Sequence, residues 1–264
     1  MNNELLVYID GEYTPKSQAK ISVFDHGLLY GDGVFEGIRA YNGVVFKLKE
    51  HVDRLYRSAH SIMLKIPLTK EEIIQAVIET LRKNKLKDAY IRLVVTRGVG
   101  DLGLDPRKCP KASVIIITDT ISLHVTGAKE NGITTMFSWV RRNPVDATTH
   151  EIKSLNYLNS VLAKIEANAN GVDEAICLES NGYIAEGVGE NVFIVKDDKI
   201  LTPPTSTGAL AGITAEVVVK LAAELGYEVT VTNLTPFMLF TADEAFFTGT
   251  AMEMVPIREV NKRQ

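Results

Sequence analysis

The segment His150–Gly171 reads HEIKSLNYLNSVLAKIEANANG and predicts a helix from Leu155 onward. Apolar residues recur at spacings of three and four, which places them on one helix face: Leu155, Leu158, Leu162, Ile165 and Ala169. Ser154 is a suitable N-cap and Gly171 a natural stop. The sequence therefore predicts an amphipathic helix in the second half of the chain.

Lys153 is a cation placed just before this helix, close to its electropositive N-terminal end. On this stretch alone, a solvated surface lysine is the favoured interpretation. The alternative is an amine whose pKa is lowered by the helix end and by apolar surroundings. Such lysines form Schiff bases with carbonyl compounds, including pyridoxal phosphate.

Composition limits the class of protein. The chain has 264 residues, is 45% hydrophobic and carries a net charge of −4, which argues against nucleic-acid binding. The longest apolar runs, such as residues 113–118, are too short to span a bilayer, and no signal peptide is evident at the N-terminus. Two distant cysteines suit a reducing cytoplasm, and the scattered histidines at positions 26, 51, 60, 124 and 150 indicate no metal site.

The first 118 residues predict a small α/β domain. Asp10-Gly11 and Asn42-Gly43 are hairpin turns between alternating strands. Two helices follow at 49–64 and 68–84, the second opened by a capping box of Thr69 and Glu72. Residues 89–98 and 112–119 are rich in β-branched residues and predict strands.

Residues 119–131 lack a clean period and predict a linker to a second domain over 132–264. In this domain a helix is expected at 212–226, ended by Gly226. Strands are expected on both sides of it: 132–140, 175–180, 183–187, 191–204, 227–235 and 244–260.

Three motifs in this second domain could hold a phosphorylated aromatic cofactor. YIAEGVGEN places Glu186 at a strand end between glycines, GALAGIT presents the amides of Ile213 and Thr214 at a helix start, and TGTAMEM contains Gly249-Thr250-Ala251. Taken singly, each has an ordinary interpretation: a hairpin with solvated glutamates, a loop with a threonine cap, and a simple turn.

Taken together and in order, IKSLNYLNS, YIAEGVGEN, LAGIT and TGTAMEM, with ISVFDHGLLYGDGVFEGIRAY at 21–41, resemble the branched-chain aminotransferases of the fold-type IV pyridoxal-phosphate enzymes. The resemblance covers almost the whole chain. It implies an α/β fold of the α+β type, with a small N-terminal domain and a larger pseudo-barrel C-terminal domain. It also implies a ping-pong exchange of amino groups between leucine, isoleucine or valine and 2-oxoglutarate.

The resemblance implies cofactor roles for residues of this sequence. Lys153 would be the Schiff-base lysine and proton shuttle, Glu186 would pair with the pyridine nitrogen, Tyr157 would bond the phenolic oxygen, and Leu210 would pack on the ring. The phosphate would be held by Arg54, Gly212, Ile213, Thr214 and Thr250.

Substrate roles follow from the same resemblance. Tyr90 and the amides of Thr250 and Ala251 would take the α-carboxylate, and Arg92, on the same strand face as Tyr90, would receive the distal carboxylate of glutamate. The side-chain pocket would be lined by Tyr30, Phe35 and Gly37. Leu104 would come from the neighbouring subunit of a homodimer or higher oligomer.

Other activities of the same fold stay open: D-amino-acid transaminase, (R)-amine transaminase and aminodeoxychorismate lyase. EGVGEN favours the branched-chain group, and the loop VGDLGLDP lacks the arginine–histidine pair typical of D-amino-acid enzymes. A non-catalytic pyridoxal-phosphate carrier is the alternative from another class. One departure is Ala211, where many relatives have proline.

Overall fold

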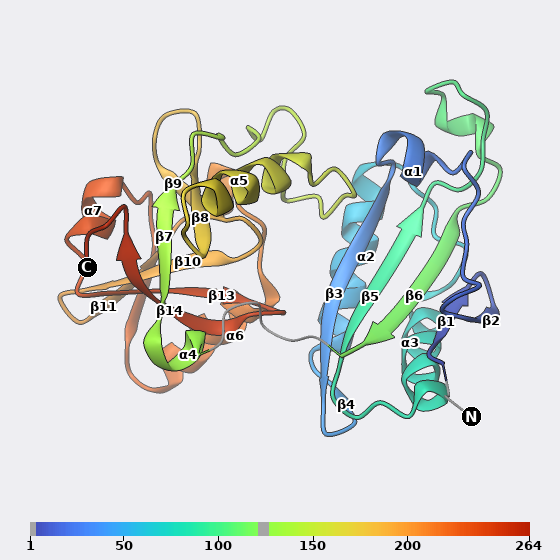
Figure 1. Cartoon of the computed structure of the whole chain (residues 1–264), viewed down its shortest axis with the longest axis horizontal. Helices are drawn as coiled ribbons and strands as arrows, with labels where there is room; N and C mark the ends of the chain where they lie inside the picture. The colour runs from blue at the N-terminus through green and yellow to red at the C-terminus, as the bar shows by residue number, and fades with distance from the viewer. Residues whose placement is uncertain (1–3, 121–126) are drawn as a thin grey trace. The chain divides into compact units, whose positions relative to one another are not determined.

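The computed structural model describes residues 4–120 and 127–264, and the chain divides into two compact units. Unit 1 comprises Met1–Ser122 with Ile152–Asn156, and unit 2 comprises Leu123–Glu151 with Tyr157–Gln264. Each unit has its own sheet and its own apolar core (Figure 1). Half of the expected linker, residues 121–126, lies outside the described residues.

Unit 1 is a six-stranded antiparallel sheet in the order β2-β1-β6-β5-β3-β4. Its strands are β1 (Leu6–Ile9), β2 (Glu12–Pro15), β3 (Gly33–Tyr41), β4 (Val44–Val45), β5 (Ala89–Thr96) and β6 (Ser113–Asp119). Its helices are α1 (His26–Tyr30), α2 (Leu48–Ser61), α3 (Lys70–Asn84) and the 3₁₀ turn η1 (Pro106–Lys108). Apolar residues of α2 and α3 form one core with β3, β5 and β6.

Local sequence signals explain much of unit 1. Asp10 and Gly11 have positive φ angles of 51° and 104°, as the predicted hairpin between β1 and β2 requires. The α3 capping box is confirmed, with the Glu72 amide donating to Thr69 Oγ1 at 3.2 Å. The apolar residues Ile73, Val77 and Leu81 on one side of α3 are buried in the core.

The segment Ile152–Asn156 joins unit 1 through the backbone of β3. The Phe35 amide donates to the Lys153 carbonyl at 3.0 Å, and the Leu155 amide donates to the Gly33 carbonyl at 3.0 Å. A Cβ on Gly33 would lie 2.6 Å from the Val95 carbonyl oxygen and 2.7 Å from Leu155 Cδ1, so the packing at this position requires glycine. Lys153 is thereby fixed to unit 1, although the chain on both sides of Ile152–Asn156 belongs to unit 2.

Unit 2 is an eight-stranded mixed sheet in the order β12-β11-β10-β13-β14-β7-β8-β9, curved into a half-barrel. Its strands are β7 (Ile133–Phe137), β8 (Glu174–Leu178), β9 (Ile184–Gly187), β10 (Asn191–Lys196), β11 (Lys199–Thr202), β12 (Glu228–Val231), β13 (Glu244–Gly249) and β14 (Glu253–Val260). Its helices are α4 (Ala128–Asn131), α5 (Leu158–Ala169), α6 (Ile213–Glu224), α7 (Pro236–Phe240) and the 3₁₀ turn η2 (Thr205–Thr207). The sequence did not predict α4 or α7.

The predicted start of α5 is wrong. The helix begins at Leu158 with Tyr157 at the N-cap, and the Ser154 hydroxyl instead accepts the Asn156 amide at 3.3 Å. Lys153 is therefore well ahead of the helix, beyond the first turn over which a helix end acts. The reason is that residues 153–155 make backbone bonds to β3 and cannot also be helical.

The predicted apolar face of α5 is also not the buried one. Leu158, Leu162 and Ile165 are exposed, whereas the small residues Ser160, Ala163 and Ala167 are buried. Ala163 and Ala167 form a small core with Ala175 and Cys177 of β8. Small side chains allow the helix to approach the strand closely, and this contact determines which face turns inward.

The predicted α/β fold class is confirmed: two sheets with helices packed on them, one of the sheets a half-barrel. Within the described residues, no helix combines the length and the apolar character needed to cross a bilayer.

Candidate active site

A buried ion triad in unit 1 fixes Arg54. Glu36 lies on β3, and Arg54 and His51 lie on one face of α2. Arg54 donates through Nε to Glu36 Oε1 and through Nη2 to Glu36 Oε2, both at 2.8 Å, and His51 Nδ1 lies 2.7 Å from Glu36 Oε2. Burial alone would raise the pKa of Glu36, but the bonds from Arg54 and His51 outweigh it and lower the pKa to about 2. Arg54 is thus a buried, oriented cation and not a surface helix residue.

Lys153 lies beside this triad in unit 1. Its amide donates to the Ser58 hydroxyl, one turn beyond Arg54 on α2, at 3.1 Å. Its ammonium nitrogen lies 4.6 Å from the centroid of the Phe35 ring. The backbone of Lys153 is therefore held by α2 and β3, and its amine lies against an aromatic wall.

Four of the predicted substrate-side residues lie together in unit 1: Phe35, Gly37, Tyr90 and Arg92. The Arg92 guanidinium carbon lies 4.6 Å from the Phe35 centroid, and Arg92 Nη2 donates to the Tyr90 hydroxyl at 3.0 Å. The prediction that Tyr90 and Arg92 share a strand face is confirmed. A Cβ on Gly37 would lie 2.2 Å from the Tyr90 hydroxyl, so glycine is needed where this ring crosses β3.

Tyr30 and Leu104 lie on α1 and on the loop between β5 and η1. Tyr30 ends α1, and its hydroxyl donates to the Leu102 carbonyl at 2.5 Å. Leu104 lies on the same loop as Leu102 and is 78% exposed. The structure thus brings Tyr30 to the loop that carries Leu104.

Glu186 is buried in unit 2 at the end of β9, which excludes the solvated hairpin glutamate considered above. Its Oε1 lies 3.1 Å from Arg142 Nε and 3.2 Å from His150 Nδ1. Its Oε2 accepts the Leu210 amide at 2.8 Å. The carboxylate is therefore contacted by a guanidinium, an imidazole and a backbone amide, and Leu210 is fixed beside it.

Arg142 anchors Glu186 and is only 1% exposed. Its Nη1 donates to Asn159 Oδ1 at 2.9 Å and to the Ser160 hydroxyl at 3.1 Å, and its Nη2 donates to the Gly187 carbonyl. Its Nε lies at ion-pair distance from Glu186 Oε1 but has no hydrogen-bond partner among the described residues. The guanidinium is therefore fixed through Nη1 and Nη2, and it places its charge beside the Glu186 carboxylate.

Tyr157 joins the Glu186 cluster through His150. The two rings are stacked, with centroids 5.6 Å apart and an interplanar angle of 25°. His150 is itself buried next to Glu186. The structure thus connects two residues, Tyr157 and Glu186, for which the resemblance implies separate cofactor roles.

The start of α6 offers backbone amides to an anion. The helix begins at Ile213, followed by Thr214, and its N-cap Gly212 makes no side-chain capping bond. A Cβ on Gly212 would lie 1.9 Å from Asn191 Oδ1, and Asn191 Nδ2 donates to the Leu210 carbonyl at 2.9 Å. Asn191 thus holds the turn that leads into α6, and the amides at a helix N-terminus suit a phosphate.

Thr250 and Ala251 lie in the turn between β13 and β14. Behind the turn, a Cβ on Gly249 would lie 3.3 Å from Glu190 Cγ. Burial, with the neighbouring Glu174 carboxylate, raises the pKa of Glu190 to about 7. The turn therefore packs on a carboxyl that holds its proton more strongly than an ordinary glutamate.

These residues fit pyridoxal phosphate. Unit 2 supplies a buried carboxylate beside an arginine and a helix of twelve residues that starts without a side-chain cap. His150 Nε2 and Thr248 Oγ1 are buried and have no hydrogen-bond partner in the described part of the chain. Buried polar atoms without partners indicate that a further polar group completes this region.

Sequence reasoning missed four of these residues. Glu36 and His51 were not singled out, although a glutamate inside an otherwise apolar strand is a signal for a buried ion pair. Arg142 and His150 lie in an irregular segment before Lys153, where no periodicity marks a buried side chain. Their importance becomes visible only through their contacts with Glu186.

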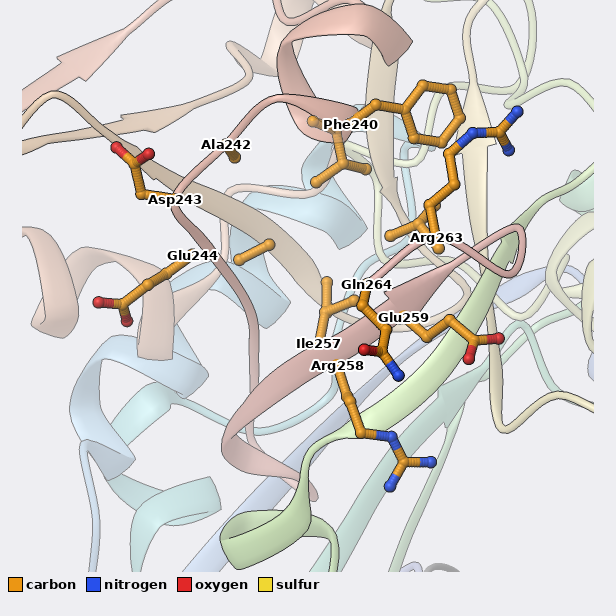
Figure 2. Close-up of a pocket in the computed structure, with 12 residues that line it drawn as sticks. Phe240, Ala242, Asp243, Glu244, Ile257, Arg258, Glu259, Arg263 and Gln264 are labelled. Carbon is orange, nitrogen blue, oxygen red and sulfur yellow. The ribbon is translucent and has the colours of Figure 1, made fainter.

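A separate pocket of about 150 Å³ lies near the end of unit 2 (Figure 2). The Arg263 guanidinium carbon lies 4.6 Å from the Phe240 ring centroid there, and Asp243 and Glu244 line another part of the wall. None of the site residues predicted from the sequence lines this pocket. We therefore do not consider it the active site.

The fold and the site residues define a class of protein. Residues 33–260 match the family model described as amino-transferase class IV, and the chain belongs to this family. Members of the family depend on pyridoxal phosphate.

Among named proteins, the chain is 59% identical over 257 residues to a Methanocaldococcus jannaschii protein provisionally named a branched-chain-amino-acid aminotransferase, covering 97% of this chain and 88% of that protein. The crystal structure of the Escherichia coli branched-chain amino acid aminotransferase matches with a TM-score of 0.96 and 38% identity, over 99% of this chain and 88% of the other. The crystal structure of the Thermoproteus uzoniensis branched-chain aminotransferase with norvaline matches with a TM-score of 0.93 and 40% identity, over 98% and 88%.

Proposed function

We propose that this chain is a branched-chain-amino-acid aminotransferase that uses pyridoxal phosphate and 2-oxoglutarate in a ping-pong reaction. The names of its relatives support this substrate class. The observation that carries the proposal is the Phe35 ring, which has the Lys153 amine and the Arg92 guanidinium each 4.6 Å from its centroid. An amine, an apolar wall and a cation for a carboxylate are thus gathered in unit 1.

The cofactor, when bound, stores the amino group and withdraws electrons from the substrate Cα. Lys153 would hold it covalently through its amine. Glu186, kept in place by Arg142, would keep a proton on the pyridine nitrogen. Tyr157 would donate to the phenolic oxygen, and Leu210 would pack on the ring.

The phosphate would be held by a cation and by backbone amides. Arg54 is oriented by Glu36 and remains charged because guanidinium groups do not deprotonate in proteins. Ile213 and Thr214 start α6 and present amides to an anion, and Thr250 would add a hydroxyl. Each of these groups would act by binding and not by proton transfer.

Substrate side chains would lie along Phe35 and Tyr30, which exclude water from the reacting carbon. Tyr90 and the amides of Thr250 and Ala251 would take the α-carboxylate. The Lys153 amine would also move the proton at the substrate Cα. Arg92 would receive the distal carboxylate when the substrate is glutamate or 2-oxoglutarate.

The working unit in this proposal is at least a homodimer, in which Leu104 reaches the pocket of the neighbouring subunit. Its exposure, together with that of Phe24 and Leu28, leaves an apolar surface on unit 1. Sedimentation of the active enzyme measures the assembly. A fully active monomer would refute this part of the proposal.

The test is transamination of L-leucine with 2-oxoglutarate by wild type, Lys153→Ala and Lys49→Ala. Lys153→Ala should abolish turnover and the cofactor adduct that borohydride traps, whereas Lys49, 79% exposed on α2, should be replaceable without loss. If the wild-type protein forms the cofactor adduct at Lys153 but does not transaminate, the chain is a non-catalytic cofactor carrier and not an aminotransferase. Full activity of Lys153→Ala would exclude the assigned mechanism.

A further inference from the structure

His150 contacts two of the residues that the proposed function gives to the cofactor ring. It is 7% exposed and lies in the irregular segment between β7 and α5. Its Nδ1 lies 3.2 Å from Glu186 Oε1, and its ring is stacked on Tyr157. A single imidazole therefore bridges the partner of the pyridine nitrogen and the partner of the phenolic oxygen.

The two ring nitrogens of His150 have different surroundings. Nδ1 faces a carboxylate oxygen, which favours a proton on Nδ1 because the oxygen can only accept. Nε2 is buried and has no hydrogen-bond partner among the described residues. A group outside those residues, such as a water or a ligand atom, would supply the hydrogen-bond partner of Nε2.

Arg142 does not make His150 redundant. Arg142 approaches the same oxygen of Glu186 with Nε, while its other nitrogens are bonded to Asn159, Ser160 and Gly187. It therefore fixes one side of the carboxylate and ties it to α5 and β9. His150 contacts the same oxygen through Nδ1, and its ring is stacked on Tyr157. His150 therefore links the Glu186 carboxylate to the Tyr157 ring, which Arg142 does not do.

We propose that His150 is a positioning residue for the cofactor ring. Nδ1 orients the Glu186 carboxylate, and the imidazole plane sets the angle of the Tyr157 ring. The inference rests on the proposed function, since it acts through the roles given there to Glu186 and Tyr157. No bond to the reacting atoms is assigned to His150.

Two substitutions separate the two contacts. His150→Phe keeps a ring to stack on Tyr157 and removes Nδ1. His150→Asn keeps an amide nitrogen near the place of Nδ1 and removes the ring. The matched controls are His60→Phe and His60→Asn, because His60 is an exposed histidine of α2.

We expect His150→Phe to lower kcat for L-leucine about tenfold with little change in KM, as loss of a bond to a charged group predicts. The pH midpoint of the bound cofactor's visible absorbance should move with it. His150→Asn should keep kcat within about threefold of wild type and weaken cofactor binding about two- to tenfold, since an aromatic pair is lost. The His60 variants should match wild type in all three measurements.

A readout without cofactor separates this inference from the proposed function. In the cofactor-free protein, the ring-nitrogen NMR signals of His150 should shift in Glu186→Gln and in Tyr157→Leu, which removes the stacked ring, and those of His60 should not. This NMR measurement tests the contacts of His150 even if the wild-type protein fails to transaminate. It also tests them if His150→Phe does not fold. Unshifted signals, or His150 variants with wild-type kcat, absorbance and cofactor affinity, would overturn the inference.

Discussion

Each unit contains a buried glutamate held by one arginine and one histidine, yet the two triads differ in geometry. In unit 1, Arg54 grips Glu36 with two nitrogens at 2.8 Å, and His51 adds a third contact at 2.7 Å. In unit 2, one nitrogen of Arg142 lies 3.1 Å from Glu186, and His150 lies 3.2 Å away. The same three residue types thus form a tight fork in one unit and a looser arrangement in the other.

The difference shows which residue of each triad is the support and which residue is oriented by it for contact with the cofactor. Both oxygens of Glu36 are occupied by cationic or imidazole donors, so this glutamate serves to orient Arg54. In the second triad Arg142 uses its nitrogens on four protein groups, so the arginine serves to orient Glu186. This agrees with the proposed roles, in which Arg54 and Glu186 are the members that meet the cofactor.

The largest effect expected is on stability, from Glu36→Gln. It leaves the buried Arg54 without its charge partner, which should cost about 3–5 kcal/mol in the free energy of unfolding. Glu186→Gln should cost less than half as much, because Arg142 keeps three other bonds. Urea unfolding of the cofactor-free proteins measures both, with the exposed Glu79→Gln as a near-neutral control. Equal losses at positions 36 and 186 would remove the distinction between the triads.

Acid should remove the contribution of the tight triad. The pKa of Glu36 is about 2 in the folded chain and 4.5 ordinarily. Because the folded value is the lower one, the ionised carboxylate stabilises the fold above pH 4.5, and this is lost as pH falls from there toward 2. Once Glu36 is fully protonated, the free energy of unfolding is lower by about 3 kcal/mol. The difference in unfolding free energy between wild type and Glu36→Gln, measured from neutral pH downward, should shrink below pH 4.5. A constant difference would contradict the assignment.

Local signals predicted local structure well, and contacts between distant residues account for what was missed. The Asp10-Gly11 hairpin and the Thr69 cap depend on neighbours within a few residues, and both are confirmed. The inward face of α5 depends on β8, which no helical period reveals. The wrong start of this helix has a similar cause, since β3 takes the backbone bonds of residues 153–155.

The site shows the same division. The shared face of Tyr90 and Arg92 follows from the period of a strand and is confirmed by their hydrogen bond. The partners of Arg54 and Glu186 were missed because no local period links Arg54 on α2 to Glu36 on β3, or Glu186 to Arg142 in the irregular segment before Lys153. A resemblance to a family identifies the residues that would meet the cofactor and the substrate. A single sequence does not identify the buried partners that orient those residues.

The looser triad should show its effect in turnover. Glu186→Gln keeps the shape of the side chain but removes the carboxylate that, in the proposed function, would keep a proton on the pyridine nitrogen, so kcat should fall about a hundredfold, or about 2.7 kcal/mol. Steady-state kinetics at saturating cofactor, with binding verified by absorbance, is the measurement. Glu79→Gln is again the control. Unchanged turnover with cofactor bound would count against the role of Glu186.

The smallest effect concerns the face of β3 opposite Glu36. Neighbouring side chains on a strand point to opposite faces, so Phe35 and Gly37 lie on the other side of the strand from the tight triad. There Arg92 lies over Phe35 and donates to Tyr90. An apolar pocket should reject the distal carboxylate of 2-oxoglutarate unless a cation meets it, and branched side chains have no such need.

Arg92→Leu should therefore weaken the half-reaction with 2-oxoglutarate far more than that with L-leucine. Loss of a charge-assisted bond predicts a fall of about ten- to a hundredfold in kcat/KM, or about 1.5–3 kcal/mol. Single-turnover kinetics separates the half-reactions, and Arg92→Lys, which keeps the charge without the planar fork, should recover part of the loss. Arg92 is removed from the Glu36 triad by the strand itself, so the variant should unfold at nearly the wild-type urea concentration. Equal losses in both half-reactions would mean that Arg92 supports Phe35 and Tyr90 and that another cation receives the carboxylate.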